Sequence, residues 1–352
     1  MKRILTLALA SALALPALAY AEKGSPLWLR HQQISPDGSQ IAFCYKGDIY
    51  TVPTAGGQAL RLTSNAAYDG TPIWSPDSRS LAFSSDREGS KDVYIVKADG
   101  SGLRRLTYSS EKEVPVAFLD GSTLLFQSYV MPDVKDGMYP WDWFVQTYSL
   151  DLSKTIARPK LYGAYPMLMP SLRGSEILYT DVKGYEDIWR KHAISPVTRD
   201  IWLRSKDGKH TKLTTFGGED RNAVWDSKGG FYYLSEREGS FNVYHRDAAT
   251  AAAADKKITS FTKNPVRFLS IASNGTLCYG FDGEIYTQTP GGQPTKVNVS
   301  IVRDQEESAI NPETIRDGVS SFAVAPSNKE IAFIVHGDVF VTHSEYGTTK
   351  RL

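Results

Sequence analysis

The sequence predicts an all-β chain: a six-bladed β-propeller of four-stranded blades, followed by the first blade of a second propeller. One residue pattern recurs about every 40 residues, a period typical of propeller blades. Within each repeat, turn residues alternate with short β-rich runs. The pattern lapses after six repeats and restarts at Phe322, shortly before Leu352.

The first 21 residues have the three regions of a secretory signal peptide. Lys2 and Arg3 give a positive start, an apolar run covers residues 4–19, and small residues surround the expected cleavage site after Ala21. The run is short for a membrane span, and a retained anchor is the less favoured alternative. We therefore expect residues 1–21 to be removed and the protein to be periplasmic or secreted.

Each repeat has four parts, which the first repeat illustrates. Residues 35–38 (Ser-Pro-Asp-Gly) form a turn, because proline presets the dihedral angle and aspartate accepts hydrogen bonds from nearby amides. The apolar run 41–45 suits a strand buried between two blades. Residues 48–50 (Asp-Ile-Tyr) open the third strand, and residues 62–63 (Leu-Thr) end the fourth.

Two repeats contain additional sequence. The third has an insertion around residues 129–144, rich in tryptophan and tyrosine, which we expect to dock on its own propeller or on further domains. The fourth has two Asp-Ile-Trp triplets, at 187–189 and 200–202. This doubling indicates an inserted excursion of about a dozen residues.

The sequence also predicts the domain boundaries. Residues 22–300 form the six-bladed propeller, and residues 301–321 are charged, poor in strand signals and read as a linker. Residues 322–352 repeat the pattern as far as the leucine of the final Leu-Thr pair. They either join the first propeller as a seventh blade or, as the linker favours, start a second, truncated propeller.

Charge and cysteine content exclude several classes of protein. Without Lys2 and Arg3, the 40 basic residues fall to 38 against 39 acidic ones, so no nucleic-acid partner is indicated. Cys44 and Cys278 are too few for a disulfide-stapled scaffold. They lie in the first and sixth repeats, which a closed ring makes neighbours, so a disulfide is conceivable, but buried free thiols are favoured.

Longer stretches connect the chain to a known family. The turn, Asp-Ile/Val-Tyr and Leu-Thr elements resemble the repeats of the TolB-type propeller superfamily. Residues 184–192 (GYEDIWRKH), 195–202 (SPVTRDIW), 216–222 (FGGEDRN) and 232–244 (YYLSEREGSFNVY) resemble, more specifically, the amino-terminal propeller of tricorn-like serine peptidases. The resemblance covers essentially the whole chain after the signal peptide.

This resemblance implies a second propeller and a carboxy-terminal catalytic part with a PDZ-like domain and a serine nucleophile assisted by histidine. No position here matches the family's catalytic motifs, and Gly-x-Ser-x-Gly is absent, so no catalytic residue is assigned. The histidines lack zinc-ligand spacing and no nucleotide-binding loop follows a strand, so neither a metal nor a cofactor is predicted.

Five residues are candidates for substrate binding. Arg87 and Arg237 occupy equivalent loops of the second and fifth repeats; they either grip a peptide carboxylate or, as we favour, form ion pairs between blades. Glu219, Asp220 and Arg221 precede the first strand of the fifth repeat and suit a polar site facing the propeller channel, with structural hydrogen bonding the favoured alternative.

The acids that open the third strands have two interpretations. They either surround the channel and bind a cation or, as their recurrence favours, hold the loop between the second and third strands. The four aspartates in this position are Asp48, Asp92, Asp200 and Asp338.

We expect the chain to be the non-catalytic propeller part of an exported tricorn-like peptidase, a scaffold that gates or routes peptides. Its expected partners are peptide substrates or products and its own carboxy-terminal domains, with a homo-oligomer possible. The alternative is a TolB-like periplasmic scaffold that recruits proteins. A propeller lyase or glycosidase would need convergent carboxylates and a cation, which the spacing does not indicate.

Overall fold

The computed structural model describes residues 26–129, 145–163, 165–184, 189–191, 195, 197–302, 317–347 and 349–352. Contacts between residues divide the chain into two units, Met1–Val302 and Arg303–Leu352. The predicted signal peptide, most of the insertion in the third repeat and most of the linker lie outside the described residues. Within the described ranges the regular structure is all β, and no helix is long and apolar enough to cross a membrane.

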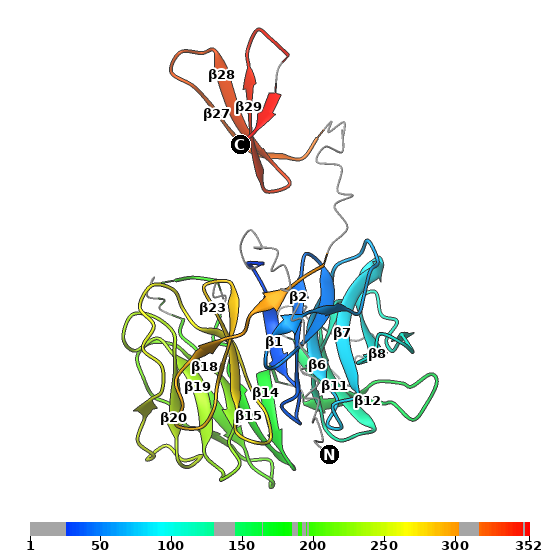
Figure 1. Ribbon diagram of the computed structural model, residues 1–352, viewed down its shortest axis with the longest axis vertical. Coiled ribbons are helices and arrows are strands. Elements are labelled where there is room, and N and C mark those ends of the chain that lie inside the picture. Colours follow the sequence, from blue (N-terminus) through cyan, green and yellow to red (C-terminus); the bar gives the residue numbers. More distant parts are fainter. Residues whose placement is uncertain are drawn as a thin grey trace, which may run out of the picture. The chain divides into compact units, whose positions relative to one another are not determined.

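The first unit contains six four-stranded antiparallel sheets, each built from strands that follow one another in the chain (Figure 1). Sheet 1 comprises β1 (Arg30–Ile34), β2 (Gln40–Tyr45), β3 (Asp48–Pro53) and β5 (Leu60–Arg61). Sheet 2 comprises β6 (Asp69–Trp74), β7 (Ser80–Glu88), β8 (Ser90–Lys97) and β9 (Arg104–Arg105). Sheet 3 comprises β10 (Glu113–Phe118), β11 (Thr123–Ser128), β12 (Gln146–Asp151) and β13 (Lys160–Gly163). Sheet 4 comprises β14 (Leu168–Arg173), β15 (Glu176–Thr180), β16 (Ile201–Arg204) and β17 (His210–Lys212). Sheet 5 comprises β18 (Asp220–Trp225), β19 (Phe231–Ser235), β20 (Asn242–Arg246) and β21 (Lys256–Lys257). Sheet 6 comprises β22 (Arg267–Ile271), β23 (Leu277–Phe281), β24 (Glu284–Gln288) and β25 (Thr295–Lys296).

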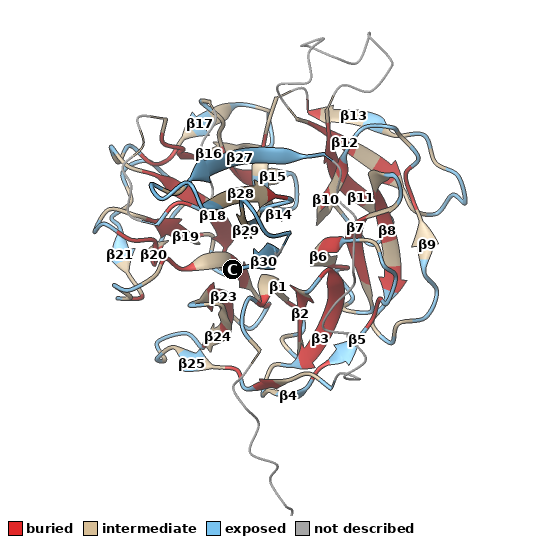
Figure 2. Cartoon of the chain, turned by 90° about the horizontal axis from the view of Figure 1, so that it is seen from above, coloured by how far each residue is buried: buried red, intermediate tan, exposed pale blue. Residues whose placement is uncertain are grey.

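The six sheets form a ring, as Figure 2 shows from above. The first strand of each sheet contacts the first strand of the next, and β22 of sheet 6 contacts β1 of sheet 1. A short parallel pair between β4 (Gly57–Gln58) and β26 (Val299–Ser300) adds to the contact of sheet 6 with sheet 1. Within the first unit, sheets 6 and 1 therefore pack directly on each other.

Hydrophobic residues fill the space between neighbouring sheets. Phe43 faces sheet 6 in one apolar cluster, whereas Ala42 and Cys44, on the opposite face of β2, join a cluster with sheet 2. A second strand therefore has two buried faces, which explains its near-continuous apolar run. Cys44 and Cys278 are buried and unpaired.

The aromatic residue of the third-strand motif packs beside an aromatic residue of the second strand. Phe43 is opposite Tyr50 in the register, and their ring centroids are 5.7 Å apart. Such a pair contributes about 0.5–1.5 kcal/mol beyond its buried area. The equivalent pairs are Phe83–Tyr94, Phe126–Tyr148, Tyr233–Tyr244 and Tyr279–Tyr286.

Hydrogen bonds account for the Leu-Thr ending. The backbone amide of Ile49, just inside the third strand, donates to the hydroxyl of Thr63 over 3.0 Å. The amide of Val93 donates in the same way to Thr107, over 2.8 Å. The threonine thus fastens the fourth strand to the start of the third; the same bond occurs in sheets 4 and 5 at Thr214 and Thr259.

The acids at the start of the third strands are ion-paired. Asp48 is 2.7 Å from Arg61, and Asp92 is 2.8 Å from Arg105. Each arginine directly precedes the Leu-Thr pair of its own sheet. These contacts favour the structural interpretation of the acids. Asp200 pairs with Lys183 and Lys212, and Asp338 with Arg351.

The second unit repeats the design of a single sheet. It contains β27 (Val319–Val324), β28 (Glu330–Val335), β29 (Asp338–His343) and β30 (Thr349–Arg351). Strand β27 begins three residues before the predicted restart, because two consecutive serines, Ser320 and Ser321, separate Val319 from the apolar run that starts at Phe322. Phe322, on this strand, is 71% exposed, so part of the apolar surface of the sheet is uncovered.

Candidate functional site

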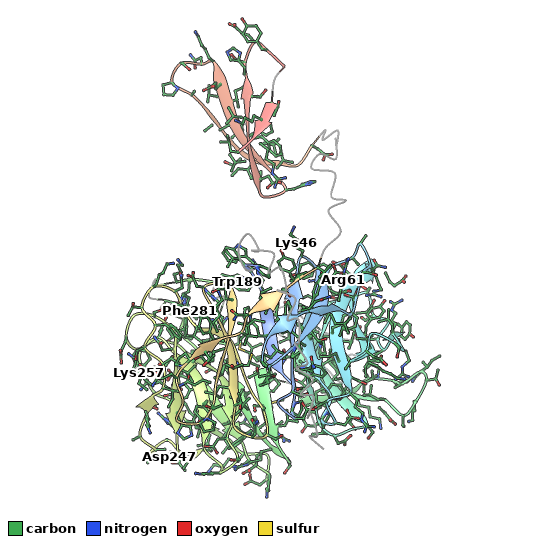
Figure 3. The ribbon with its side chains drawn as sticks, viewed as in Figure 1. Lys46, Arg61, Trp189, Asp247, Lys257 and Phe281 are labelled. Atoms are coloured by element: carbon green, nitrogen blue, oxygen red, sulfur yellow. The ribbon has the colours of Figure 1, made fainter. Side chains whose placement is uncertain are left out.

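The five candidate residues lie at one rim of the ring, where second strands end and first and third strands begin. We call it the 2–3 rim, after the loops that join second to third strands. Figure 3 labels Lys46 and Trp189, which belong to such loops in sheets 1 and 4; Asp247, which follows a third strand, lies at the opposite rim.

Arg87 neutralises a buried carboxylate within its own sheet. Its Nη2 donates to both oxygens of Asp69, over 3.0 and 2.9 Å, and its Nε donates to the Ser85 hydroxyl over 2.9 Å. Asp69 is at the start of β6 and lies opposite Ser85 in the register. The preferred expectation of an ion pair between blades is therefore wrong: the two-residue step from Ser85 turns Arg87 back onto its own first strand.

Arg237 repeats this arrangement in sheet 5. Its Nε donates to Ser235 over 2.9 Å, and its Nη2 is 3.4 Å from a carboxylate oxygen of Asp220. Burial raises the pKa of Asp220 to about 6, although Ser235 and Arg237 oppose the shift. A second carboxylate, Asp255, accepts from Arg237 over 2.5 Å. Here too the expected pairing between blades is replaced by pairing within one sheet.

Glu219 is the centre of a buried ion cluster. Its side chain is fully buried, and its oxygens are 2.9 Å from Arg190, 3.2 Å from Arg199 and 3.4 Å from Arg221. Arg190 also pairs with Glu236. Three guanidinium groups thus face two carboxylates. We call these five residues the Glu219 cluster.

The Glu219 cluster carries an excess of positive charge. Burial lowers the pKa of Arg221 to about 10, and the neighbouring Arg267, Arg199 and Arg190 add to this effect. Burial would also lower the pKa of Arg190, but its hydrogen bonds to Glu236 and Glu219 outweigh burial and raise it. The cluster is therefore stable only while its carboxylates stay ionised.

Trp189 connects the Glu219 cluster to sheets 6 and 1. Arg267 donates to the carbonyl oxygens of Trp189, over 2.7 Å, and Arg190, over 3.1 Å. The guanidinium groups of Arg267 and Arg30 are 5.3 and 5.2 Å from the centroid of the Trp189 ring, which suits cation–π contact. Arg30 is also 5.7 Å from the Trp28 ring.

This arginine and tryptophan surface is partly open to solvent. Trp189 is 43% exposed and Trp28 is 69% exposed. We call Trp28, Arg30, Trp189 and Arg267 the rim patch. It combines guanidinium groups, which bind carboxylates in a fixed geometry, with indole faces that accept apolar groups.

Irregularities in the first strands set the directions of side chains that belong to the rim patch. The pairing of each first strand with its second strand contains a register shift, between Arg30 and Gln33 in sheet 1 and between Arg267 and Ser270 in sheet 6. His31 has φ 54° and Phe268 has φ 57°, left-handed conformations that L-residues seldom adopt. Such bulges re-aim the side chains beside them.

The structure unites four of the five candidates and separates the fifth. Glu219, Asp220, Arg221 and Arg237 belong to sheet 5 and its entry, whereas Arg87 belongs to sheet 2. Sequence reasoning missed seven residues, although the doubled Asp-Ile-Trp triplet marked the segment that supplies three of them. These seven are Trp28, Arg30, Trp189, Arg190, Arg199, Glu236 and Arg267.

The rim patch has the chemistry of a binding surface. In the part of the chain that the structure describes, no group of three or more His, Cys, Asp or Glu residues could hold a metal ion. What the rim patch offers is positive charge beside aromatic surface, which attracts anionic groups.

Comparison with known proteins agrees with the ring architecture. Residues 26–293 match the model of the Tricorn protease N-terminal beta propeller domain. Tricorn protease homolog 1 of Streptomyces coelicolor is 22% identical over 334 residues, which cover 93% of this chain and 30% of that protein. Putative tricorn protease homolog 2 of the same organism is 23% identical over 341 residues, covering 92% of this chain and 27% of that protein.

A solved structure gives the same result. The crystal structure of the tricorn protease superposes with a TM-score of 0.64 at 18% identity, covering 93% of this chain and 31% of that one. The chain thus spans less than a third of the length of these two tricorn protease homologues. With the family model matched over most of its residues, the chain belongs to the family of tricorn protease N-terminal β-propeller domains.

Proposed function

We propose that this chain is the non-catalytic propeller part of an exported tricorn-like serine peptidase, and that it serves as scaffold and as a routing surface for peptides. The observation that carries the proposal is the rim patch. Its guanidinium groups suit the carboxylates of peptide termini and acidic side chains, and its indoles suit apolar side chains.

The remaining parts of the proposal rest on family membership and on the sequence. The relatives are more than three times as long, so we propose that the catalytic part of the parent peptidase is the chain's structural partner. The second unit, with Phe322 exposed on its first strand, suits the start of a second propeller. Residues 1–21 direct export in this proposal.

The rim patch, which the sequence did not predict, replaces Arg87 and Arg237 as the proposed contact for peptides. Arg87 is held by Asp69, and Arg237 by Asp220 and Asp255. A guanidinium already paired with a buried carboxylate has little to gain from a second one. We assign both arginines a structural role and keep the Glu219 cluster as the support that positions Trp189.

The test measures peptide binding to the purified chain by fluorescence anisotropy. Labelled peptides with a free carboxyl terminus should bind more tightly than the same peptides with an amidated terminus, and Arg267→Gln should reduce this preference. Arg79→Gln is the matched control, because Arg79 is exposed in a first turn at the opposite rim. Equal binding of both peptide forms would remove the basis of the proposal.

A second experiment separates the peptidase proposal from the TolB-like alternative. The purified chain should bind peptides without cleaving them, as liquid chromatography of the incubated peptides would reveal. Turnover that a serine-directed inhibitor abolishes would contradict the non-catalytic assignment. Stable capture of a folded protein, together with no peptide binding, would favour the TolB-like scaffold.

A further inference from the structure

Sheets 2 and 5 neutralise the buried acid at the start of their first strand in the same way. Asp69 is held by Arg87, and Asp220 is held by Arg237. In both sheets, the arginine follows by two residues the serine that lies opposite the acid in the register. Arginine is thus the internal counter-ion of this position.

Sheet 3 has the acid and the serine but not the arginine. Glu113 lies at the start of β10, opposite Ser128 in the register, and both side chains are fully buried. The residue two positions after Ser128 in the sequence is Val130. Among the described residues, no hydrogen bond of good geometry reaches either carboxyl oxygen of Glu113 or the Ser128 hydroxyl, although Thr107 and the backbone of Ser109 lie close enough to affect Glu113. Residues directly opposite in a ladder place their side chains on the same face.

Among the described residues, the nearest arginine is already paired. Asp92 of sheet 2 interacts with Glu113 across the boundary between the sheets, and Arg105 is 2.8 Å from Asp92. Arg104, the other arginine of β9, donates instead to the carbonyl oxygens of Leu152 and Lys154. Burial raises the pKa of Glu113 to about 7; hydrogen bonding from Thr107 and the Ser109 backbone opposes the shift, and Asp92 adds to it. Among the described residues, Glu88 at the end of β7 also acts on Asp92, while Lys112, just before β10, faces the like charge of Lys91 on β8.

We propose that Glu113 binds a proton in place of the missing arginine, so that the boundary between sheets 2 and 3 is a pH-sensitive joint. The carboxyl group takes its proton from water, and the neutral acid shares that proton with Asp92. A divalent metal fits less well, because only two carboxylates meet here and Asp92 already has Arg105. The inference is independent of the proposed peptide binding.

The joint adjoins the apolar contact between the two sheets. Val93 and Leu106 of sheet 2 pack with Leu124 and Phe126 of sheet 3 in one buried cluster. Val93 directly follows Asp92 in the chain. A second negative charge beside Asp92 therefore repels across this boundary and weakens it.

The sign of the pH effect follows from proton linkage. The pKa of Glu113 is higher in the folded chain, about 7, than its ordinary value of 4.5. Stability from the bound proton is complete below the ordinary value and is lost as pH rises through about 7. From about pH 5 to about pH 8, this one group should raise the unfolding equilibrium constant by roughly 50- to 100-fold.

The experiment compares wild type with Glu113→Gln in urea unfolding at about pH 5 and about pH 8, in buffer treated with a chelator. The amide of the variant is neutral at both pH values. The free energy of unfolding of the variant should therefore rise relative to that of wild type as pH rises. Asp69→Asn is the matched control: it breaks the pair with Arg87 and should be less stable than wild type at both values.

Two outcomes would overturn the proposal. One is a difference between wild type and Glu113→Gln that is the same at both pH values. The other is a wild type that recovers at the higher pH when millimolar Ca²⁺ or Mg²⁺ is added, which would identify a metal site. If the variant does not fold, hydrogen exchange of wild-type residues 113–128 decides: protection that is equal at both values, after correction for intrinsic rates, refutes the joint.

Discussion

Glu219→Gln is the sharpest test of the Glu219 cluster. The change keeps the size of the side chain and one oxygen acceptor, but it removes the negative charge that Arg199 and Arg221 face. Glu219 is fully buried, and the side chains of these arginines are only 7% and 4% exposed. Water therefore cannot compensate for the lost charge.

The expected loss is large for a single substitution. Breaking a buried ion pair by removing one partner costs about 3–5 kcal/mol, because a buried charge is left uncompensated. In a domain of this size, about 2–4 °C of melting temperature correspond to each kcal/mol, so the transition should fall by roughly 6 to 20 °C. Added salt should restore little of it, since buried pairs are poorly screened.

Urea unfolding followed by tryptophan fluorescence provides the assay. The matched control is Lys263→Gln, which breaks an ion pair with Asp282 whose side chains are 77% and 43% exposed. An exposed pair of this kind is worth less than about 1 kcal/mol. If Glu219→Gln lies within the same small range as this control, the cluster does not depend on its central carboxylate and the reasoning fails.

Three further predictions concern the sheets. Thr107→Val should cost about 1–3 kcal/mol in urea unfolding, because it leaves a buried third-strand amide without its acceptor, and an unchanged midpoint would contradict this. Burial opposes ionisation of Asp255, but hydrogen bonds from Arg246 and others outweigh it and lower its pKa to about 2. Its contribution should therefore be present above its ordinary pKa and fade as pH falls through about 2, and Asp255→Asn should remove that part of the acid transition. Burial raises the pKa of Cys44 and Cys278 to about 12, so neither should react with a thiol reagent in the native chain; fast native labelling would argue against their burial.

Local chemistry explains why the sheets were predictable from sequence. The first turn is closed by its own residues: the Ser35 hydroxyl donates to Asp37 over 2.5 Å, and the Ser39 amide donates to the same carboxylate over 3.0 Å. The threonine of the Leu-Thr ending accepts a hydrogen bond from the third strand of the same sheet. Signals of this kind depend on a few neighbouring residues, so they are visible without a structure.

The site was less predictable because its contacts join distant segments. Arg190 and Glu236 are separated by 46 positions, and Arg267 reaches the carbonyl oxygen of Trp189 from 78 positions away. No repeat in the sequence predicts that these distant residues contact one another. The direction of Arg87 was misjudged for a related reason: its spacing from Ser85 was visible, but the fold of the strand end that turns it onto Asp69 was not.

The sheets differ from one another in sequence, and these differences give the rim features that a ring of identical sheets could not have. Six identical sheets would give a rim with the same charge in every direction, and such a rim cannot distinguish one end of a peptide from the other. Here the excursion in sheet 4 brings Trp189 and Arg190 to the 2–3 rim, next to Arg30 and Arg267. Sheet 3, in contrast, has no arginine two residues after Ser128, so Glu113 lacks the counter-ion found in sheets 2 and 5. The rim patch thus joins sheets 4, 6 and 1, and an asymmetric surface of this kind is what the proposed routing of peptides would need.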